Sequence, residues 1–106
     1  MIQEIDYKRL GARIKQLRQS RGFTQEGLAE AVGCNTTHIS NIENDHTKVS
    51  LNVLLAIANA LDTSIDLLLS DQYGNSAAAL DNAVINAISA LDDDKKEKIL
   101  KIIEIL

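Results

Sequence analysis

Apolar residues recur with helical spacing along most of the chain. In the stretch that follows Asp6, Leu10, Ile14 and Leu17 fall at positions i, i+4 and i+7, which places them on one face of a helix. Asp6 is a suitable N-cap, and Gly22 is a suitable left-handed stop. The pattern therefore predicts a first helix between these two residues.

A second and a third helix are predicted to follow in quick succession. Thr24 can cap a helix that ends at Gly33, and the chain restarts immediately afterwards. In the next segment, TTHISNIEN, Ile39 and Ile42 are the only strongly apolar residues. Such a helix buries a narrow stripe and exposes small polar side chains elsewhere, and the turn at residues 44–45 follows it.

Two further helices complete the first predicted domain. Ser50 can cap LNVLLAIANALD, which is apolar on most sides and is therefore expected at the centre of the core. Thr63 and Ser64 begin a short fifth helix, SIDLLLS. The residues predicted to be buried in these two helices are Leu51, Leu54, Leu55, Ile57, Ala58, Leu61, Ile65, Leu68 and Leu69.

A second, smaller region is predicted after a linker. Residues 71–76 have linker-like composition and separate a domain of residues 1–70 from residues 77–106. Helical patterns over 77–91 and from the acidic residues 92–94 to the C-terminus predict a helical hairpin, since acids at a helix N-terminus complement its dipole. With no proline and 3% aromatic residues, the chain fits an all-α fold better than a β-sandwich.

Two short helices joined by a tight turn, the second polar and exposed, form a helix-turn-helix. The segment TQEGLAEAVGCNTTHISNIEN, with IKQLRQSRGF before it and LLAIANALDTSIDLLL after it, resembles the lambda-repressor-like (Xre-type) helix-turn-helix family over about residues 7–70. Several motifs agree: R-x-x-x-G-[FL]-[ST]-Q, L-A-x-x-V-G, I-x-x-[IL]-E-N and S-[IV]-D-x-L-L. The resemblance implies a five-helix DNA-binding domain of a bacterial or phage-type transcriptional regulator, with a recognition helix at about 35–44. The small size of the chain, and not the resemblance, favours a repressor over an activator.

The resemblance also implies which residues read DNA bases. Readout at the first turn of the third helix and about one turn later corresponds to Thr36, Thr37 and Asn41, with His38 and Asn35 as secondary candidates. The side chains suit this task, because a major groove about 12 Å wide admits a helix and presents donors, acceptors and methyl groups. Asn41 can bind adenine with two hydrogen bonds, and a threonine methyl can contact the methyl of thymine.

Phosphate contacts are implied on either side of that helix. In the family, a glutamine at the position of Gln25 holds a phosphate together with backbone N–H groups, and a helix N-terminus favours an anion there. The loop after the third helix follows the DNA backbone, where contacts position the protein without reading sequence. For Arg13, a solvated helix face is the alternative. The phosphate candidates are Gln25, Thr24, Asn44, His46, Thr47, Lys48 and Arg13.

Other residues receive structural interpretations. The resemblance implies that Arg18 and Glu43 form a partly buried salt bridge between the first and third helices, rather than contacting phosphate and solvent. Asp45 stands where the family often has glycine, and aspartate tolerates a left-handed turn. Cys34 fits a packing role better than a redox sensor, because the chain has no second thiol to resolve it.

Composition excludes several functional classes. One cysteine and two histidines eight residues apart predict no disulfide and no metal site. No arrangement of Ser, His, Asp or Cys assembles a nucleophilic centre, so we expect no enzyme, no cofactor and no small-molecule ligand. No apolar run approaches ~18 residues, and the N-terminus lacks a secretory signal. A reducing cytoplasm is the expected compartment.

The C-terminal hairpin is predicted to dimerise. About thirty residues cannot bury two apolar helices by themselves, and large exposed apolar patches mark interfaces. A two-fold dimer places two recognition helices about one turn of DNA apart on a palindromic operator. The alternatives are a hairpin folded back within a monomer, and an antitoxin or other interaction module that binds a regulatory partner protein. The predicted dimerisation residues are Leu80, Val84, Ile88, Leu91, Ile99, Ile102, Ile103 and Leu106.

The net charge of −4 argues against nucleic acid only when it is taken as one number. Residues 8–48 carry seven basic and four acidic side chains, a balance of +3, whereas residues 1–7 carry −2 and residues 49–106 carry −5. The acidic excess therefore lies outside the segment expected to bind double-stranded DNA. This distribution predicts low non-specific affinity, with specificity resting on the recognition helix and on dimer geometry.

Overall fold

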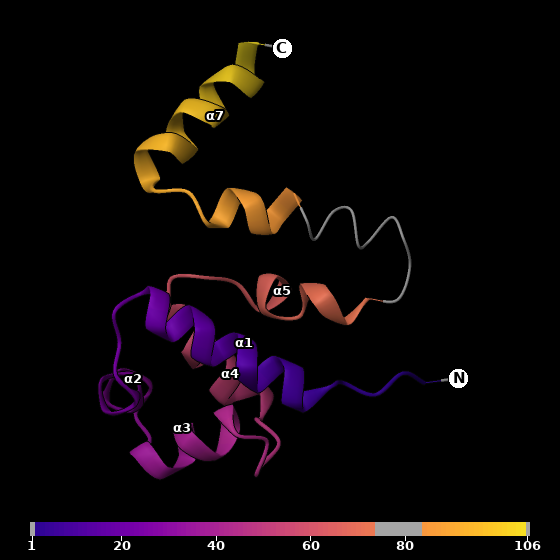
Figure 1. Cartoon of the computed structure of the whole chain (residues 1–106), viewed down its shortest axis with the longest axis vertical. Helices are drawn as coiled ribbons and strands as arrows, with labels where there is room; N and C mark the ends of the chain where they lie inside the picture. Colours follow the sequence, from indigo (N-terminus) through magenta and orange to yellow (C-terminus); the bar gives the residue numbers. More distant parts are fainter. Residues whose placement is uncertain (1, 74–83, 106) are drawn as a thin grey trace. The chain divides into compact units, whose positions relative to one another are not determined.

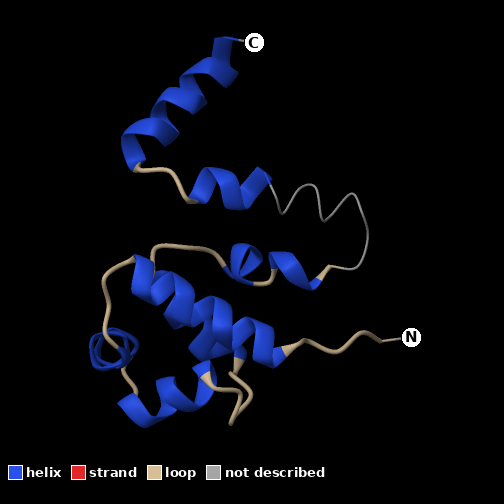
Figure 2. Ribbon diagram, viewed as in Figure 1, coloured by secondary structure: helices blue, strands red, loops and turns tan. Residues whose placement is uncertain are grey.

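The computed structural model describes residues 2–73 and 84–105, and these residues contain helices, turns and loops (Figure 2). The chain divides into two compact units, Met1–Gln72 and Tyr73–Leu106. Every regular element of the described residues is a helix, which confirms the predicted all-α class for this part of the chain. Within that part, no helix combines the length and the apolar character needed to cross a lipid bilayer.

The first unit contains the five predicted helices in the predicted order (Figure 1). A short 3-10 helix follows them and extends the unit to Gln72, two residues beyond the expected boundary at Ser70. The elements are α1 (Tyr7–Ser20), α2 (Gln25–Val32), α3 (Thr36–Glu43), α4 (Leu51–Ala60), α5 (Ile65–Leu68) and η1 (Ser70–Gln72).

Local chemistry explains where these helices begin and end. Each of the five α-helices has an N-cap whose side-chain oxygen accepts a hydrogen bond from a backbone N–H in the first turn, which satisfies one otherwise unpaired donor. Gly22 (φ +78°) and Gly33 (φ +88°) adopt the left-handed conformation that a Cβ would strain. Asp45 (φ +60°) makes the predicted left-handed turn. The N-caps are Asp6, Thr24, Asn35, Ser50 and Ser64.

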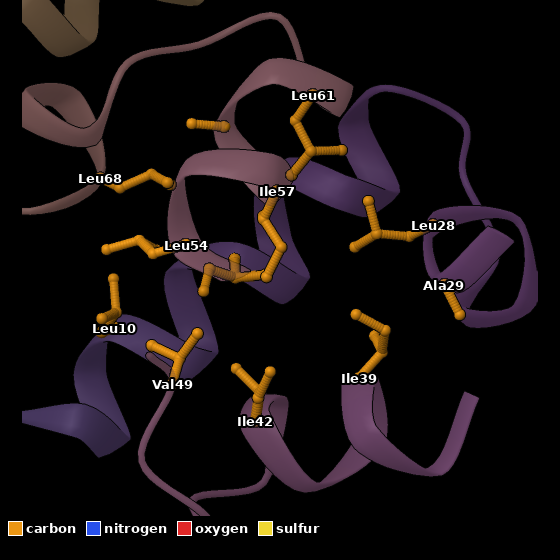
Figure 3. Close-up of a cluster of buried hydrophobic side chains, with 12 residues drawn as sticks. Leu10, Leu28, Ala29, Ile39, Ile42, Val49, Leu54, Ile57, Leu61 and Leu68 are labelled. Atoms are coloured by element: carbon orange, nitrogen blue, oxygen red, sulfur yellow. The ribbon is translucent and has the colours of Figure 1, made fainter. Parts of the chain in front are cut away.

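The core of the first unit lies where α1, α2, α3 and α4 meet (Figure 3). Ile39 and Ile42 point from α3 toward Ile57 of α4, which is fully buried (Figure 3). Burying each such side chain contributes roughly 1.5–3 kcal/mol. The buried apolar residues are Leu10, Ile14, Leu28, Ala29, Ile39, Ile42, Val49, Leu54, Ile57, Ala58, Leu61 and Leu68.

The prediction that α4 is buried on most sides is wrong for two residues. Leu51 and Leu55 are 70% and 51% exposed, whereas Leu54, Ile57 and Ala58 are buried. The helix packs against α2 and α5, and these neighbours leave Leu51 and Leu55 largely uncovered. Apolar residues cover more of the circumference of α4 than its neighbours do, which periodicity alone could not reveal.

The second unit contains helical residues 84–89 and the helix α7 (Asp93–Ile105), joined at residues 90–92. The first of the three predicted acids, Asp92, caps α7, since its Oδ1 accepts a hydrogen bond from the backbone N–H of Lys95 at 2.8 Å. Of the helix predicted over 77–91, residues 77–83 lie outside the described residues.

None of the residues in α7 is buried. Ile102 and Ile103, predicted for dimerisation, are 58% and 56% exposed. Val84 and Ile88 are also exposed, and Leu91 and Ile99 are half-buried. The remaining predicted dimerisation residues, Leu80 and Leu106, lie outside the described residues.

Candidate nucleic-acid interface

The helix α3 lies at the edge of the first unit, with α1 and α4 on one side of it (Figure 1). The turn from α2 to α3 spans Gly33 to Asn35, and both helices pack closely against each other. Ile39 and Ile42 anchor α3 in the core, so its opposite face is directed away from the unit.

The outward face of α3 carries a row of three polar residues. Thr37, Asn41 and Asn44 follow one another at i, i+4 and i+7, opposite the buried isoleucines. Thr37 and Asn44 are exposed and Asn41 is half-buried. Two predicted base readers thus share one row with Asn44, which the sequence had assigned to phosphate. We call Thr37, Asn41 and Asn44 the polar row.

The other predicted base readers have different surroundings. Thr36 and His38 are half-buried and flank the row. The side-chain oxygen of Asn35 accepts a hydrogen bond from the backbone N–H of His38 at 2.8 Å, so this oxygen is engaged in capping α3. Thr24 caps α2 in the same way, with Gly27 as the donor at 2.9 Å.

The side chain of Ser40 is a further polar group of α3 and contacts the last residue of the row. The amide nitrogen of Asn44 donates to the backbone oxygen of Ser40 at 2.9 Å and to its hydroxyl oxygen at 3.3 Å. The hydroxyl therefore accepts from Asn44 and retains its own O–H as a donor. The i, i+4 spacing of the two residues was the available signal.

The C-terminal end of α3 is held by a buried ion pair. The carboxylate of Glu43 accepts from Nε of Arg18 at 2.7 Å and from its Nη2 at 3.1 Å. Both side chains are buried, at 8% and 0% exposed, and Nη1 of Arg18 donates to the Phe23 carbonyl at 2.8 Å. The predicted salt bridge between α1 and α3 is confirmed. Its fork geometry is the strong, bidentate kind.

Gln25 joins this ion pair. Its amide nitrogen donates to the Glu43 carboxylate at 3.1 Å, which ties the first turn of α2 to the end of α3. A glutamine amide has two N–H donors, so the second remains available for a phosphate. Gln25 therefore has a positioning role in addition to the predicted phosphate contact.

Gly11 allows α1 to approach the end of α3 directly. A Cβ at this position would overlap the backbone oxygen of Ile42 and lie 3.1 Å from that of Glu43. Backbone atoms cannot rotate away as a side chain can, so any larger residue must separate the two helices. Sequence analysis did not identify Gly11, because no local pattern marks this contact.

The loop after α3 remains close to the end of the helix. The backbone N–H of His46 donates to the Asn41 carbonyl at 2.8 Å. His46 and Lys48 are exposed, whereas Thr47 is half-buried. The ammonium of Lys48 lies 5.6 Å from the centroid of the Tyr7 ring, within cation–π distance. The loop thus presents an exposed cation near the start of α1.

The structure does not bring Arg13 together with the other phosphate candidates. Its guanidinium donates to the Ser70 hydroxyl at 3.1 Å and lies 3.8 Å from the Asp71 carboxylate. In Figure 1, α5 lies on the opposite side of α1 from α3. Arg21 is also engaged within the unit, since its Nε donates to the Leu61 carbonyl at 2.9 Å.

Among the described residues, no group of three or more His, Cys, Asp or Glu side chains is arranged to hold a metal ion. Cys34 is half-buried and packs against the hydrophobic core, which agrees with its predicted packing role. The interface is therefore built from neutral polar side chains, backbone N–H groups and a few cations.

Comparisons with known proteins agree with this geometry. The model of the helix-turn-helix family matches residues 14–68. The HTH-type transcriptional regulator ImmR of Bacillus subtilis is 33% identical over 88 residues, which cover 80% of this chain and 69% of ImmR. The chain spans only 13–14% of the length of two larger curated relatives.

Solved structures match both a part and nearly the whole of the chain. The P22 c2 repressor protein in complex with a synthetic operator matches with a TM-score of 0.53 and 34% identity, over 56% of this chain and 89% of that one. The complex of the SinR and SinI proteins matches with a TM-score of 0.57 and 26% identity, over 90% of this chain and 94% of that one. ImmR and SinR are named as HTH-type transcriptional regulators, so the family consists of transcription regulators rather than enzymes, as the sequence predicted.

Proposed function

Because the chain belongs to the lambda-repressor-like helix-turn-helix family of DNA-binding transcriptional regulators, we propose that it represses transcription by binding a specific operator in the cytoplasm. The observation that carries this proposal is α3, which exposes a polar row over an anchored apolar stripe. A helix of this kind fits the major groove, where base edges present distinct donors and acceptors.

Base readout is assigned to α3 and positioning to its surroundings. Asn41 offers a donor and an acceptor for adenine, and Thr37 offers a methyl and a hydroxyl group. Thr36, with His38 and Asn35 in second place, completes the base-reading set. We assign phosphate contacts to the second N–H of Gln25 and to the ammonium of the exposed Lys48, and the remaining N–H of the Gln25 amide supports the first of these assignments.

We further propose that the protein binds a palindromic operator as a homodimer through its C-terminal unit. The support is the apolar surface of α7, where four aliphatic side chains are more than half exposed and no residue is buried. Apolar area removed from water contributes about 25 cal/mol per Å², which makes pairing with a second copy favourable. Two-fold symmetry of the protein then requires two-fold symmetry of the DNA site.

A partner protein is the second candidate for the same apolar surface. The matched SinR–SinI structure is a complex of two proteins, and its match extends over 90% of this chain. A partner that covers α7 in place of a second copy would separate the two DNA-binding units. Operator affinity would then depend on the concentration of that partner, since avidity is lost when the units are no longer joined.

Selection of bound fragments from a random DNA pool tests the proposed function. We expect enrichment of a palindrome whose half-sites lie about ten base pairs apart, centre to centre. Enrichment of no sequence would contradict operator binding, whereas enrichment of a single half-site would contradict the homodimer. Sedimentation that gives only an 11.6 kDa species at every concentration would also contradict the homodimer.

A further inference from the structure

The end of the first unit is fastened to its beginning by side-chain amides. The backbone N–H of Asp6 donates to Oε1 of Gln72 at 2.9 Å, and Nε2 of Gln72 donates back to the Asp6 carbonyl at 3.2 Å. The amide of Gln3 donates to the Gln72 carbonyl at 2.8 Å. These bonds join residues 66 and 69 positions apart, where sequence composition predicted a linker.

Charged side chains of α1 hold the two preceding residues. Arg9 donates to the Asp71 carbonyl at 3.3 Å and lies 3.8 Å from its carboxylate. Arg13 lies 3.8 Å from the same carboxylate and donates to the hydroxyl of the buried Ser70 at 3.1 Å. We call these contacts of residues 70–72 with Gln3, Asp6, Arg9 and Arg13 the exit clasp.

The exit clasp fixes both the position and the direction in which the chain leaves the DNA-binding unit. Three consecutive residues are each held by at least one side chain of α1 or by the segment before it. The bonds of Gln72 join neutral groups, so salt weakens them little compared with the ion pairs of Asp71. Changes in salt should therefore alter the bonds of Gln72 less than they alter DNA binding.

We propose that the exit clasp determines which separations of operator half-sites this protein accepts. This inference rests on the proposed homodimer, in which residues 73–83 are the only chain between the clasp and the described helix of the C-terminal unit. Release of residues 70–72 adds up to about 10 Å to that connection in each protomer. It also frees the direction in which the chain leaves.

The effect follows from the geometry of B-DNA. Each added base pair moves the second half-site by about 3.4 Å and rotates it by about a tenth of a turn. A short connection with a fixed exit tolerates such shifts poorly, because the second unit then binds at a low effective concentration. A clasped chain is thus selective for one spacing, and an unclasped chain accepts several.

The test measures affinity for two half-sites as their spacing changes by one to three base pairs from the optimum. We compare the unsubstituted protein with Gln72→Ala, which removes the bonds to Asp6. Gln19→Ala is the matched control, because Gln19 is an exposed glutamine of α1 outside the clasp. An insertion of Gly-Ser-Gly after Tyr73 lengthens the connection while it leaves the clasp intact.

We expect the unsubstituted protein and Gln19→Ala to lose about 100-fold in affinity on a shifted site, whereas the loss for Gln72→Ala should be only about 10-fold. The insertion variant should resemble Gln72→Ala. Binding to a single half-site should stay within about twofold for all four proteins. Gln3→Ala removes one bond of the clasp and should give a spacing profile between those of the unsubstituted protein and Gln72→Ala. It replaces Gln72→Ala in the test if that variant does not fold.

Two results would overturn the proposal that the exit clasp determines the accepted spacing. If the spacing profiles of Gln72→Ala and Gln3→Ala superimpose on that of the unsubstituted protein, the clasp does not determine the accepted spacing. An insertion without effect on the profile would lead to the same conclusion. If the unmodified protein binds paired half-sites no better than a single one, the homodimer proposal fails instead. The single half-site measurement separates these two failures.

Discussion

The helices α4 and α7 are both rich in apolar residues, yet they differ in what covers them. In α4, Leu54, Ile57 and Ala58 are buried against α2 and other elements of the first unit. In α7, Ile102 and Ile103 have the same chemistry and more than half of their surface is exposed. The comparison shows that apolar periodicity identifies a helix face that has to be covered, whereas tertiary structure identifies the element that covers it.

The ion pairs of the two units differ in the same way. Arg18 and Glu43 form a buried bidentate pair that connects two helices and a loop. Asp94 and Lys98 form an i, i+4 pair at 3.3 Å on α7, with both side chains about three-quarters exposed. The first pair is surrounded by a packed core and the second by water. Single substitutions should therefore affect the two units very differently.

Loss of one partner of the buried pair should have the largest effect. Arg18→Ala leaves the Glu43 carboxylate buried without its main counter-charge, and should lower the free energy of unfolding by about 3–5 kcal/mol. Urea unfolding measures this change. The double variant Arg18→Met, Glu43→Leu is the control, because it removes both charges and should recover part of the loss. A loss below about 1 kcal/mol for Arg18→Ala would contradict the structural role of the pair.

A single methyl group at Gly11 should be almost as damaging to the packed unit. The Cβ of Gly11→Ala meets backbone oxygens of Ile42 and Glu43, so α1 and α3 must separate, at a cost of about 3 kcal/mol. Thermal unfolding measures the change. Gly27→Ala is the matched control, because its Cβ meets only side-chain atoms at 3.2 and 3.6 Å. Equal effects of both substitutions would contradict the close approach of α1 and α3.

In the second unit, the expected damage is to assembly and not to folding. Ile103→Asp places a charge on the exposed apolar side of α7, and should convert the dimer to an 11.6 kDa monomer in sedimentation. Affinity for a palindromic operator should fall about 100-fold, since the second half-site no longer binds intramolecularly. Lys101→Ala, on the same helix, should leave both measurements unchanged. A stable dimer of Ile103→Asp would place the interface elsewhere.

Loss of a base contact should affect DNA binding alone. Asn41→Ala should weaken binding to a cognate half-site by about 1–3 kcal/mol, with no change in dimerisation or in affinity for random DNA. Lys48→Ala is the informative comparison, because loss of a phosphate contact weakens all sequences alike and lowers the salt slope by about one. Equal losses of Asn41→Ala on cognate and random DNA would refute its base-reading role.

The smallest effect is expected at the exposed ion pair of α7. Lys98→Ala removes its contact with Asp94, and should change the free energy of unfolding by less than about 0.5 kcal/mol. Chemical denaturation at low and high salt measures the change, which should vanish at high salt. A loss comparable to that of Arg18→Ala would show that α7 is packed in solution far more tightly than its exposed side chains indicate.

Residues that act locally were predictable. A capping side chain contacts a backbone N–H within its own first turn, so Asp6, Thr24 and Ser50 could be recognised from neighbouring sequence. The buried stripe of α3 was equally clear, because Ile39 and Ile42 are its only strongly apolar residues. The pairing of Arg18 with Glu43 came from the family resemblance, and the structure confirms it.

Residues that act across the fold were missed or misplaced. The amide of Gln72 binds backbone atoms of Asp6, a contact that no spacing rule describes. Arg13 was expected on a solvated or phosphate-binding face and instead holds Ser70. Leu55 was expected in the core and is exposed. In each case the outcome depends on which element lies opposite, and that information is not local.

The sequence by itself determined the helices, their caps, the helix-turn-helix and the polar character of α3, since these depend on contacts within one or two turns. Tertiary structure decided which apolar faces are covered, how closely α1 approaches α3 at Gly11, and where the chain leaves the first unit. These features join residues far apart in the chain, and close packing makes each depend on the shape of its neighbours.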